Sequence, residues 1–275
     1  MTATLVIARL TFQEAARRRV LLAALVMGLL FLALFAVGFY LMVSDPEHDS
    51  LLGNSEIHNF FLMAGLYVIN FLTVMMTVLT SVDTLSGEIT TGTMHTLASK
   101  PVQRWEIVLG KWLGFVGMLS LYLLMMAGGV MVIVYLFAGY IAPGALRGLA
   151  LMWLNVVLLL SLSLLGGATL STLANGVMVF GIYGVAFVGG WIEQVGSFIG
   201  NQTAIELGTV ASLLMPGEAL WKRAAYEMRS PLVDALGFSP FSAPSVPSTL
   251  MIVYAVGYTL VMLALAVRQF NRRDL

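Results

Sequence analysis

Residues 83–111 read DTLSGEITTGTMHTLASKPVQRWEIVLGK, and they form the longest polar stretch in the first half of a very apolar chain. The middle carries a short apolar set at helical spacing, formed by Met94, Leu97 and Ala98. Lys100 is disfavoured in a helix because a proline follows it, and a new helix can begin at Pro101, where the missing N–H is not needed. The stretch therefore predicts a membrane helix, a short surface helix, a break and a second membrane helix.

The composition indicates that most of the chain lies in lipid. Of the 275 residues, 59% are hydrophobic and only 10% are charged, whereas soluble domains carry about 25% charged residues. The chain has no cysteine, which excludes disulfides and thiolate metal sites. We expect an all-α polytopic membrane protein with six transmembrane helices, forming a single domain over residues 1–275.

Six long apolar runs are the predicted membrane spans. They cover about residues 20–43, 60–82, 106–137, 147–170, 177–194 and 250–267. A span needs about 20 apolar residues, and the first run is longer than the apolar core of a signal peptide. We therefore interpret the first run as a membrane helix that stays in the protein.

Two further segments are expected to lie at the membrane surface. Residues 1–19 are basic and predict an amphipathic interface helix. Its apolar face would be formed by Leu5, Ala8, Phe12, Ala15 and Ala16. A basic segment that only sets the topology is the alternative. Residues 195–249 form a long outer loop whose apolar part, 204–214, is too short to span, so we expect re-entrant or interfacial helices there.

The distribution of basic residues predicts the orientation. The side of the two chain ends and of residues 83–104 carries Arg9, Arg17, Arg18, Arg19, Lys100, Arg104, Lys111, Arg268, Arg272 and Arg273. The other side carries Arg147, Lys222, Arg223 and Arg229. Of the 14 basic residues, ten against four place both termini and the polar stretch in the cytoplasm by the positive-inside rule. We expect a multi-pass protein of the cell (inner or plasma) membrane.

The motifs of several enzyme classes are absent. The sequence has no GxxxxGK[ST] phosphate loop, no HExxH, no GxSxG and no CxxC, and we predict that the chain is not an enzyme. No predicted span carries an ionisable residue near its middle, which disfavours an ion-driven carrier. The acidic loop 44–59, with His48 and His58, could bind a metal, but an ordinary solvated loop is the simpler interpretation.

The polar stretch resembles the connector of the ABC-2 type permeases, the membrane subunits of one large class of ABC exporters. The matching positions are Gly87-Glu88, Gly92-Thr93, Leu97, Lys100-Pro101-Val102, Arg104 and Gly110-Lys111. The stretches LLMP (213–216) and EALW (218–221) also resemble that family's segment before its last span. The whole chain resembles the family in architecture, with a basic start, six spans and a polar connector after the second.

The resemblance implies partners. The permease would dimerise, with itself or with a related subunit, and two copies of a separate ABC ATPase would dock underneath. ATP and magnesium would be held by that ATPase, and the permease would hold no cofactor. The expected contacts to the ATPase, within the cytoplasmic coupling segment 83–104, are Glu88, Thr91, Gly92, Thr93, Met94, Leu97 and Arg104. The transported substrate stays open, with lipid, peptide, drug and metal-linked cargo as candidates.

Simpler roles remain open for several of these residues. Glu88 could be a solvated acid at a helix N-terminus, and Arg104 could pair with Glu106 or only set the topology. Lys111 is expected to reach out to the membrane interface. Four polar residues of the spans could line a translocation path or bond to neighbouring helices: Asn70, Thr73, Thr77 and Asn155. A membrane scaffold or assembly factor without a transport path is the alternative function.

Overall fold

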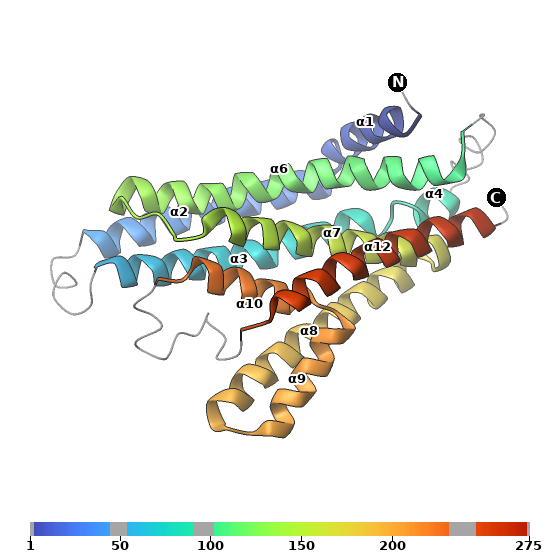
Figure 1. Cartoon of the computed structure of the whole chain (residues 1–275). Coiled ribbons are helices and arrows are strands. Elements are labelled where there is room, and N and C mark those ends of the chain that lie inside the picture. The colour runs from blue at the N-terminus through green and yellow to red at the C-terminus, as the bar shows by residue number, and fades with distance from the viewer. Residues whose placement is uncertain (1–2, 45–53, 91–101, 231–245, 274–275) are drawn as a thin grey trace.

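The computed structural model describes residues 3–44, 54–90, 102–230 and 246–273. These residues form helices and no strand, which confirms the all-α fold class. The helices are α1 (Ala3–Ala16), α2 (Arg19–Val43), α3 (Asn54–Ser81), α4 (Ser86–Thr90), α6 (Arg104–Ala138), α7 (Ala145–Thr169), α8 (Thr172–Ile199), α9 (Gln202–Leu214), α10 (Gly217–Met228) and α12 (Thr249–Arg272). Figure 1 shows an elongated bundle in which α4, the start of α6 and the end of α12 lie at one end.

Six helical segments are long and apolar enough to cross a membrane, as the sequence predicts. They are α2, α3 together with α4 (Ser55–Thr90), α6, α7, α8 and α12. The fifth span is longer than its predicted range, because α8 continues to Ile199 instead of ending near residue 194. The longer helix moves Glu193 from the predicted end of a span into the body of α8.

The core of the bundle lies around α7. An unbroken run from Asn155 to Leu164 is buried, and α7 packs against α3, α6, α8, α10 and α12. A helix that is apolar all round is expected to be surrounded by other helices. By contrast, α2 exposes large apolar side chains such as Leu22, Leu30 and Leu34. That surface suits contact with lipid or with another membrane subunit.

The N-terminal helix α1 packs along the first part of α6. Its residues lie against Gly110 and Gly114, and a Cβ at Gly114 would come within 2.6 Å of the carbonyl oxygen of Ala8. Glycine is needed at Gly114 because any side chain would push α1 away. Leu5, which the sequence placed on the apolar face of an interface helix, is exposed together with Leu10. Contact of this outer face with the membrane interface stays a prediction.

The long loop predicted between the fifth and sixth spans folds back along the bundle. Gly200, with a φ of 71°, ends α8, and α9 returns beside α8 (Figure 1). α10 then runs along α7, with Gly217 against Asn155 and Met228 against Gly148. The turn between α9 and α10 therefore lies about 15 Å along α7 from its first residue, at 1.5 Å per residue. The helices α9 and α10 thus fold back along the bundle, and a re-entrant or interfacial position in the membrane stays a prediction.

Candidate functional site

The polar connector between α3 and α6 begins with residues 81–90, which are held in place by neighbouring helices and are called the connector base below. α4 follows the end of α3 and leads into residues 91–101, which lie outside the described residues. Ser81 Oγ donates to Ser163 Oγ of α7 at 2.8 Å, and Ser86 Oγ lies 2.8 Å from Thr172 Oγ1 of α8. The chain is therefore tied to two neighbouring helices directly before the connector.

Asn175 of α8 also holds this base. Its Nδ2 donates to the carbonyl oxygen of Val82 at 3.1 Å and to that of Ser163 at 2.9 Å. Asn175 is fully buried, and a buried carbonyl that loses its partner costs about 1–3 kcal/mol. Because Asn175 joins the end of α3 to α7 and α8, a displacement of the connector base has to involve all three helices.

A buried ion pair joins the two sides of the connector. Lys111 of α6 donates to Glu88 of α4, and their side chains are 4% and 16% exposed. The sequence predicted that Lys111 reaches the interface, but the structure places it on the buried face of α6 with Ile107, Val108 and Phe115. Separating such a pair leaves an uncompensated buried charge at a cost of about 3–5 kcal/mol. The pair therefore fixes α4 against α6.

Arg104, at the far end of the connector, is used within the chain. Its Nη1 donates to the carbonyl oxygens of Asn271 at 3.2 Å and Arg273 at 2.6 Å, at the end of α12. Glu106, the partner considered from the sequence, instead accepts from the backbone N–H of Gln103 at 3.0 Å and caps α6. Arg104 thereby links the start of α6 to the last membrane helix.

The junction of α1 and α2 also contacts the residues directly before the connector. Arg18 pairs with Glu14 at 2.8 Å and lies 3.9 Å from Asp83. Asp83 Oδ1 also accepts from Thr172 Oγ1 at 3.2 Å. The residues just before the connector are therefore in contact with α8 and with the basic N-terminal segment.

Of the seven residues predicted to meet an ATPase, two are described. Glu88 and Arg104 lie on opposite sides of the connector, and each is bound inside the chain. The other five lie outside the described residues: Thr91, Gly92, Thr93, Met94 and Leu97. The sequence argument missed the pairing of Lys111, although its apolar neighbours at positions three and four away indicate the buried side of the helix.

The four polar residues proposed for a translocation path are buried in this conformation. Thr73 Oγ1 donates to the carbonyl oxygen of Ile69, and Thr77 Oγ1 to that of Thr73, each at 2.7 Å within α3. Asn70 is 5% exposed and Asn155 is 1% exposed. The two threonines thus satisfy their hydroxyl groups within their own helix, and a path-lining role stays a prediction.

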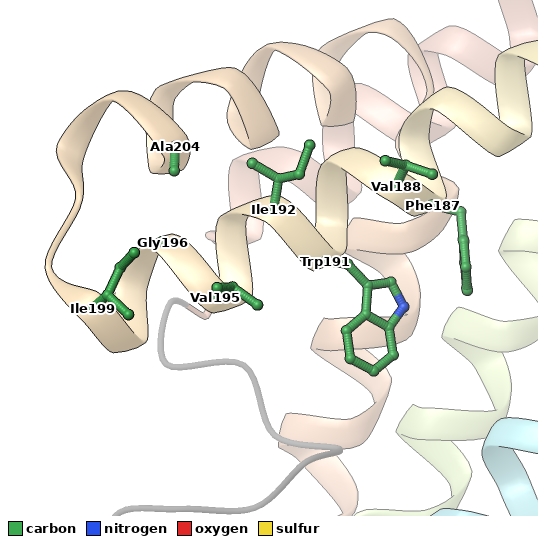
Figure 2. A pocket seen from close by; sticks show the side chains of 8 residues that line it. All are labelled: Phe187, Val188, Trp191, Ile192, Val195, Gly196, Ile199 and Ala204. Carbon is green, nitrogen blue, oxygen red and sulfur yellow. The ribbon is translucent and has the colours of Figure 1, made fainter.

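Figure 2 shows an apolar groove of about 600 Å³ on α8 and the start of α9, far along α8 from the connector base. Its lining residues are Phe187, Val188, Trp191, Ile192, Val195, Gly196, Ile199 and Ala204. Apart from the Trp191 indole, these side chains offer only van der Waals contact. The shape and chemistry suit an acyl chain or an apolar helix and do not suit a polar ligand.

No group of three or more His, Asp and Glu residues within the described ranges could hold a metal. Of the acidic and histidine residues of the loop 44–59, Glu56 and His58 are described, and both have other contacts. Glu56 Oε1 accepts from Ser230 Oγ at 2.6 Å, and the His58 ring lies 5.8 Å from that of Phe39. The rest of that loop, residues 45–53, lies outside the described residues.

Comparison with known proteins gives one family match. The model described as "ABC-2 family transporter protein" matches residues 5–275, which is nearly the whole chain. A search of curated proteins finds none that matches. The match covers the connector, all six candidate spans and the pair α9–α10.

Proposed function

Because the chain belongs to the ABC-2 family of transporter proteins, whose members are multi-pass membrane components of transporters, we propose that it is the permease subunit of an ATP-driven exporter. A separate ATPase subunit binds ATP and magnesium and docks on the coupling segment 83–104. The permease itself carries out no chemistry. Its task is to convert movement of that segment into movement of the membrane helices.

The observation that best supports this proposal is the anchoring of the connector. On one side, α4 is held by Glu88–Lys111 and by Ser86–Thr172. On the other side, Arg104 holds the end of α12. A force applied to the connector would therefore reach α3, α6 and α8, because the Glu88–Lys111 pair is largely buried and separates only at high cost. The hydrogen bonds of Arg104, which are more exposed, extend the connection to α12. A loosely attached loop would not transmit such a force.

The charge distribution supports a cytoplasmic connector. The start of α6 carries Arg104 and Lys111, and the end of α12 leads to Arg273; Figure 1 shows these two helix ends and α4 at one end of the bundle. Arg18 lies near Asp83, just before α4. The opposite end carries fewer basic residues, among them Arg147. In the proposed orientation both termini are cytoplasmic, as the positive-inside rule favours, and a soluble ATPase reaches the connector directly.

A second permease copy completes the proposed transporter. α2 and α12 expose apolar side chains along much of their length, and the groove of Figure 2 adds an apolar surface on α8. These surfaces suit lipid or a second membrane subunit. In the proposed exporter, substrate passes between two permeases when the ATPases close, and a homodimer or a pair with a related permease would both satisfy this arrangement.

Copurification tests the docking site. The full-length chain, expressed with an ABC ATPase of the same organism that copurifies with it, should retain that ATPase through membrane extraction. The double variant Gly92→Ala/Leu97→Ala should lose at least tenfold of the bound ATPase. The matched control is Gly257→Ala/Leu250→Ala on α12, where Leu250 is 77% exposed and a Cβ on Gly257 meets nothing within 4 Å. ATPase binding that is equal in both double variants would refute docking on the connector.

Transport assays separate the permease from the alternatives. In vesicles that hold the complex, added substrate should change ATP turnover, and export should need ATP. A scaffold without a path would show no response of turnover to any substrate. Transport driven by an ion gradient without ATP would instead support an ion-driven carrier.

A further inference from the structure

Two acids and one base form a buried cluster where α10 packs against α8. Lys222 Nζ donates to Glu193 Oε2 at 2.8 Å and to the carbonyl oxygen of Gly190 at 3.1 Å. The side chains of Lys222 and Glu193 are 5% and 12% exposed, and Glu218 is 5% exposed. In the sequence, Glu193 lies near the end of the predicted span 177–194 and the other two residues lie in the loop 195–249, so the cluster could not be expected from it.

Glu218 is the member of the cluster without a counter-ion of its own. Its side chain lies over Gly190, where an added Cβ would clash with Glu218 Cγ. Lys222 is already bound by Glu193 and by the carbonyl oxygen of Gly190, and within the described part of the chain Glu218 makes no ion pair. One ammonium group cannot neutralise two buried carboxylates, and an uncompensated buried charge costs several kcal/mol.

Among the described residues, Lys222 is the one basic group that acts on Glu218. The titratable groups that act on it or respond to it are Glu193 and Tyr183 of α8, Tyr67 of α3 and Lys222 of α10. Asn155 of α7 faces the start of α10: its Oδ1 would lie 2.7 Å from a Cβ on Gly217. Neither Oδ1 nor Nδ2 of Asn155 has a hydrogen-bond partner among the described residues, and the residue is 1% exposed. In the part of the chain that the structure describes, the site therefore has unpaired amide groups near Glu218 but no basic residue besides Lys222.

We propose that Glu218 is a proton-binding site and that α10, packed against α8, holds the proton there. The carboxylate takes up one proton from water and becomes a neutral acid. Lys222 and Glu193 then remain as a balanced pair, and the cluster carries no net charge. Glu218 lies in the first turn of α10, where the helix dipole favours the anion by about 0.3–1 kcal/mol, but this gain is smaller than the cost of burying a charge.

The direction of the pKa shift agrees with the geometry. Burial raises the pKa of the Glu218 carboxyl from 4.5 to about 7, with Lys222 opposing the rise and Glu193 adding to it. When α10 leaves α8 and water reaches Glu218, its pKa returns toward the ordinary value and the proton is released. The proton therefore stabilises the packed state fully below pH 4.5, and this stabilisation fades as the pH rises through about 7.

Infrared spectroscopy of the full-length chain in lipid nanodiscs tests the site without an ATPase or a substrate. We expect a protonated carboxyl C=O band that disappears with a midpoint near pH 7 and is missing in Glu218→Gln. In Glu218→Asp a titrating band should persist at a shifted frequency. The matched control is Glu206→Gln on the exposed face of α9, which should keep the band. No such band in the unmodified protein, or an unchanged band in Glu218→Gln, would overturn the proposal.

A second experiment tests the link between the proton and the packing of α10. Because the chain has no cysteine, Ala219→Cys introduces a single thiol at a position that is 2% exposed. The rate at which a water-soluble thiol reagent labels this cysteine should rise between pH 6 and pH 8. The rise should be about tenfold larger than in Ala219→Cys/Glu218→Gln, in which only the thiol itself depends on pH. Equal increases in the two proteins would overturn the link.

Discussion

Lys111 of α6 binds Glu88 of α4, and these two residues stand on either side of the connector that leads out of the bundle. Both side chains are largely withdrawn from solvent. The pair therefore holds together the two helices that flank the connector, α4 before it and α6 after it. In the proposed exporter this is the point at which movement of the connector enters the membrane domain.

Removing one partner of this pair should destabilise the protein. Lys111→Met leaves the Glu88 carboxylate buried and unpaired, at an expected cost of about 3–5 kcal/mol. Denaturant-induced unfolding of the protein in detergent measures the effect. Lys111→Met/Glu88→Leu should recover most of the loss, because no buried charge is left without a partner.

The control for this pair is Arg147→Gln, which removes an ion pair to Glu227 in which the Arg147 side chain is 79% exposed. Its cost should stay within about 1 kcal/mol, as for other exposed pairs. Equal costs for Lys111→Met and Arg147→Gln would show that the buried pair does not hold the base.

The packing of α1 on α6 gives a second prediction. Gly114→Leu should displace α1, since even a Cβ would come within 2.6 Å of the Ala8 carbonyl oxygen, and overpacking of this kind costs about 1–3 kcal/mol. Gly128→Leu makes the same change on the same helix, where a Cβ meets nothing within 4 Å. Limited proteolysis should cleave the N-terminal segment faster in Gly114→Leu alone. Identical cleavage in both variants would contradict the packing of α1 on α6.

The buried amide of Asn175 gives a prediction about coupling. Asn175→Leu removes the hydrogen bonds to Val82 and Ser163, so the connector base should move independently of α7 and α8. The bound ATPase should keep its basal turnover, while the response of turnover to substrate should fall several-fold. Thr169→Val, which removes a side-chain bond made within α7, should keep the response. A full substrate response in Asn175→Leu would exclude Asn175 from the route of coupling.

Arg104 gives a prediction for the last helix. Arg104→Gln removes the hydrogen bonds to the Asn271 and Arg273 carbonyl oxygens, and amide hydrogen exchange over residues 268–273 should become faster. Arg268→Gln, an exposed basic residue of α12, should leave exchange in that segment nearly unchanged. The idea fails if both variants exchange at the rate of the unmodified chain.

The membrane fold could be predicted from the sequence because lipid imposes a simple rule on helix length and polarity. Runs such as residues 20–43 and 147–170 meet that rule without any knowledge of their neighbours, and the structure has helices there. The polar stretch that contains Gly92 and Leu97 could also be predicted from the sequence, since a break between two apolar runs is a matter of local composition.

The partners of the polar residues could not be predicted in the same way. Lys111 and Glu88 are 23 residues apart, and Glu193 and Lys222 are 29 apart, so each pairing depends on how whole helices pack. Glu218 could be assigned only to the loop 195–249, because α10 is short and polar for a membrane segment. Only the return of α9 along α8 brings Glu218 into the interior.

The most direct test of the account is a crosslink from the connector to the ATPase in intact cells. Leu97→Cys provides the only thiol in the chain, and a membrane-permeant thiol-to-amine crosslinker can join it to a neighbouring protein. The account predicts one main product, whose peptides identify an ATPase with a GxxxxGK[ST] phosphate loop. Labelling of the same cysteine by an impermeant reagent added outside the cell, with no ATPase crosslink, would contradict it.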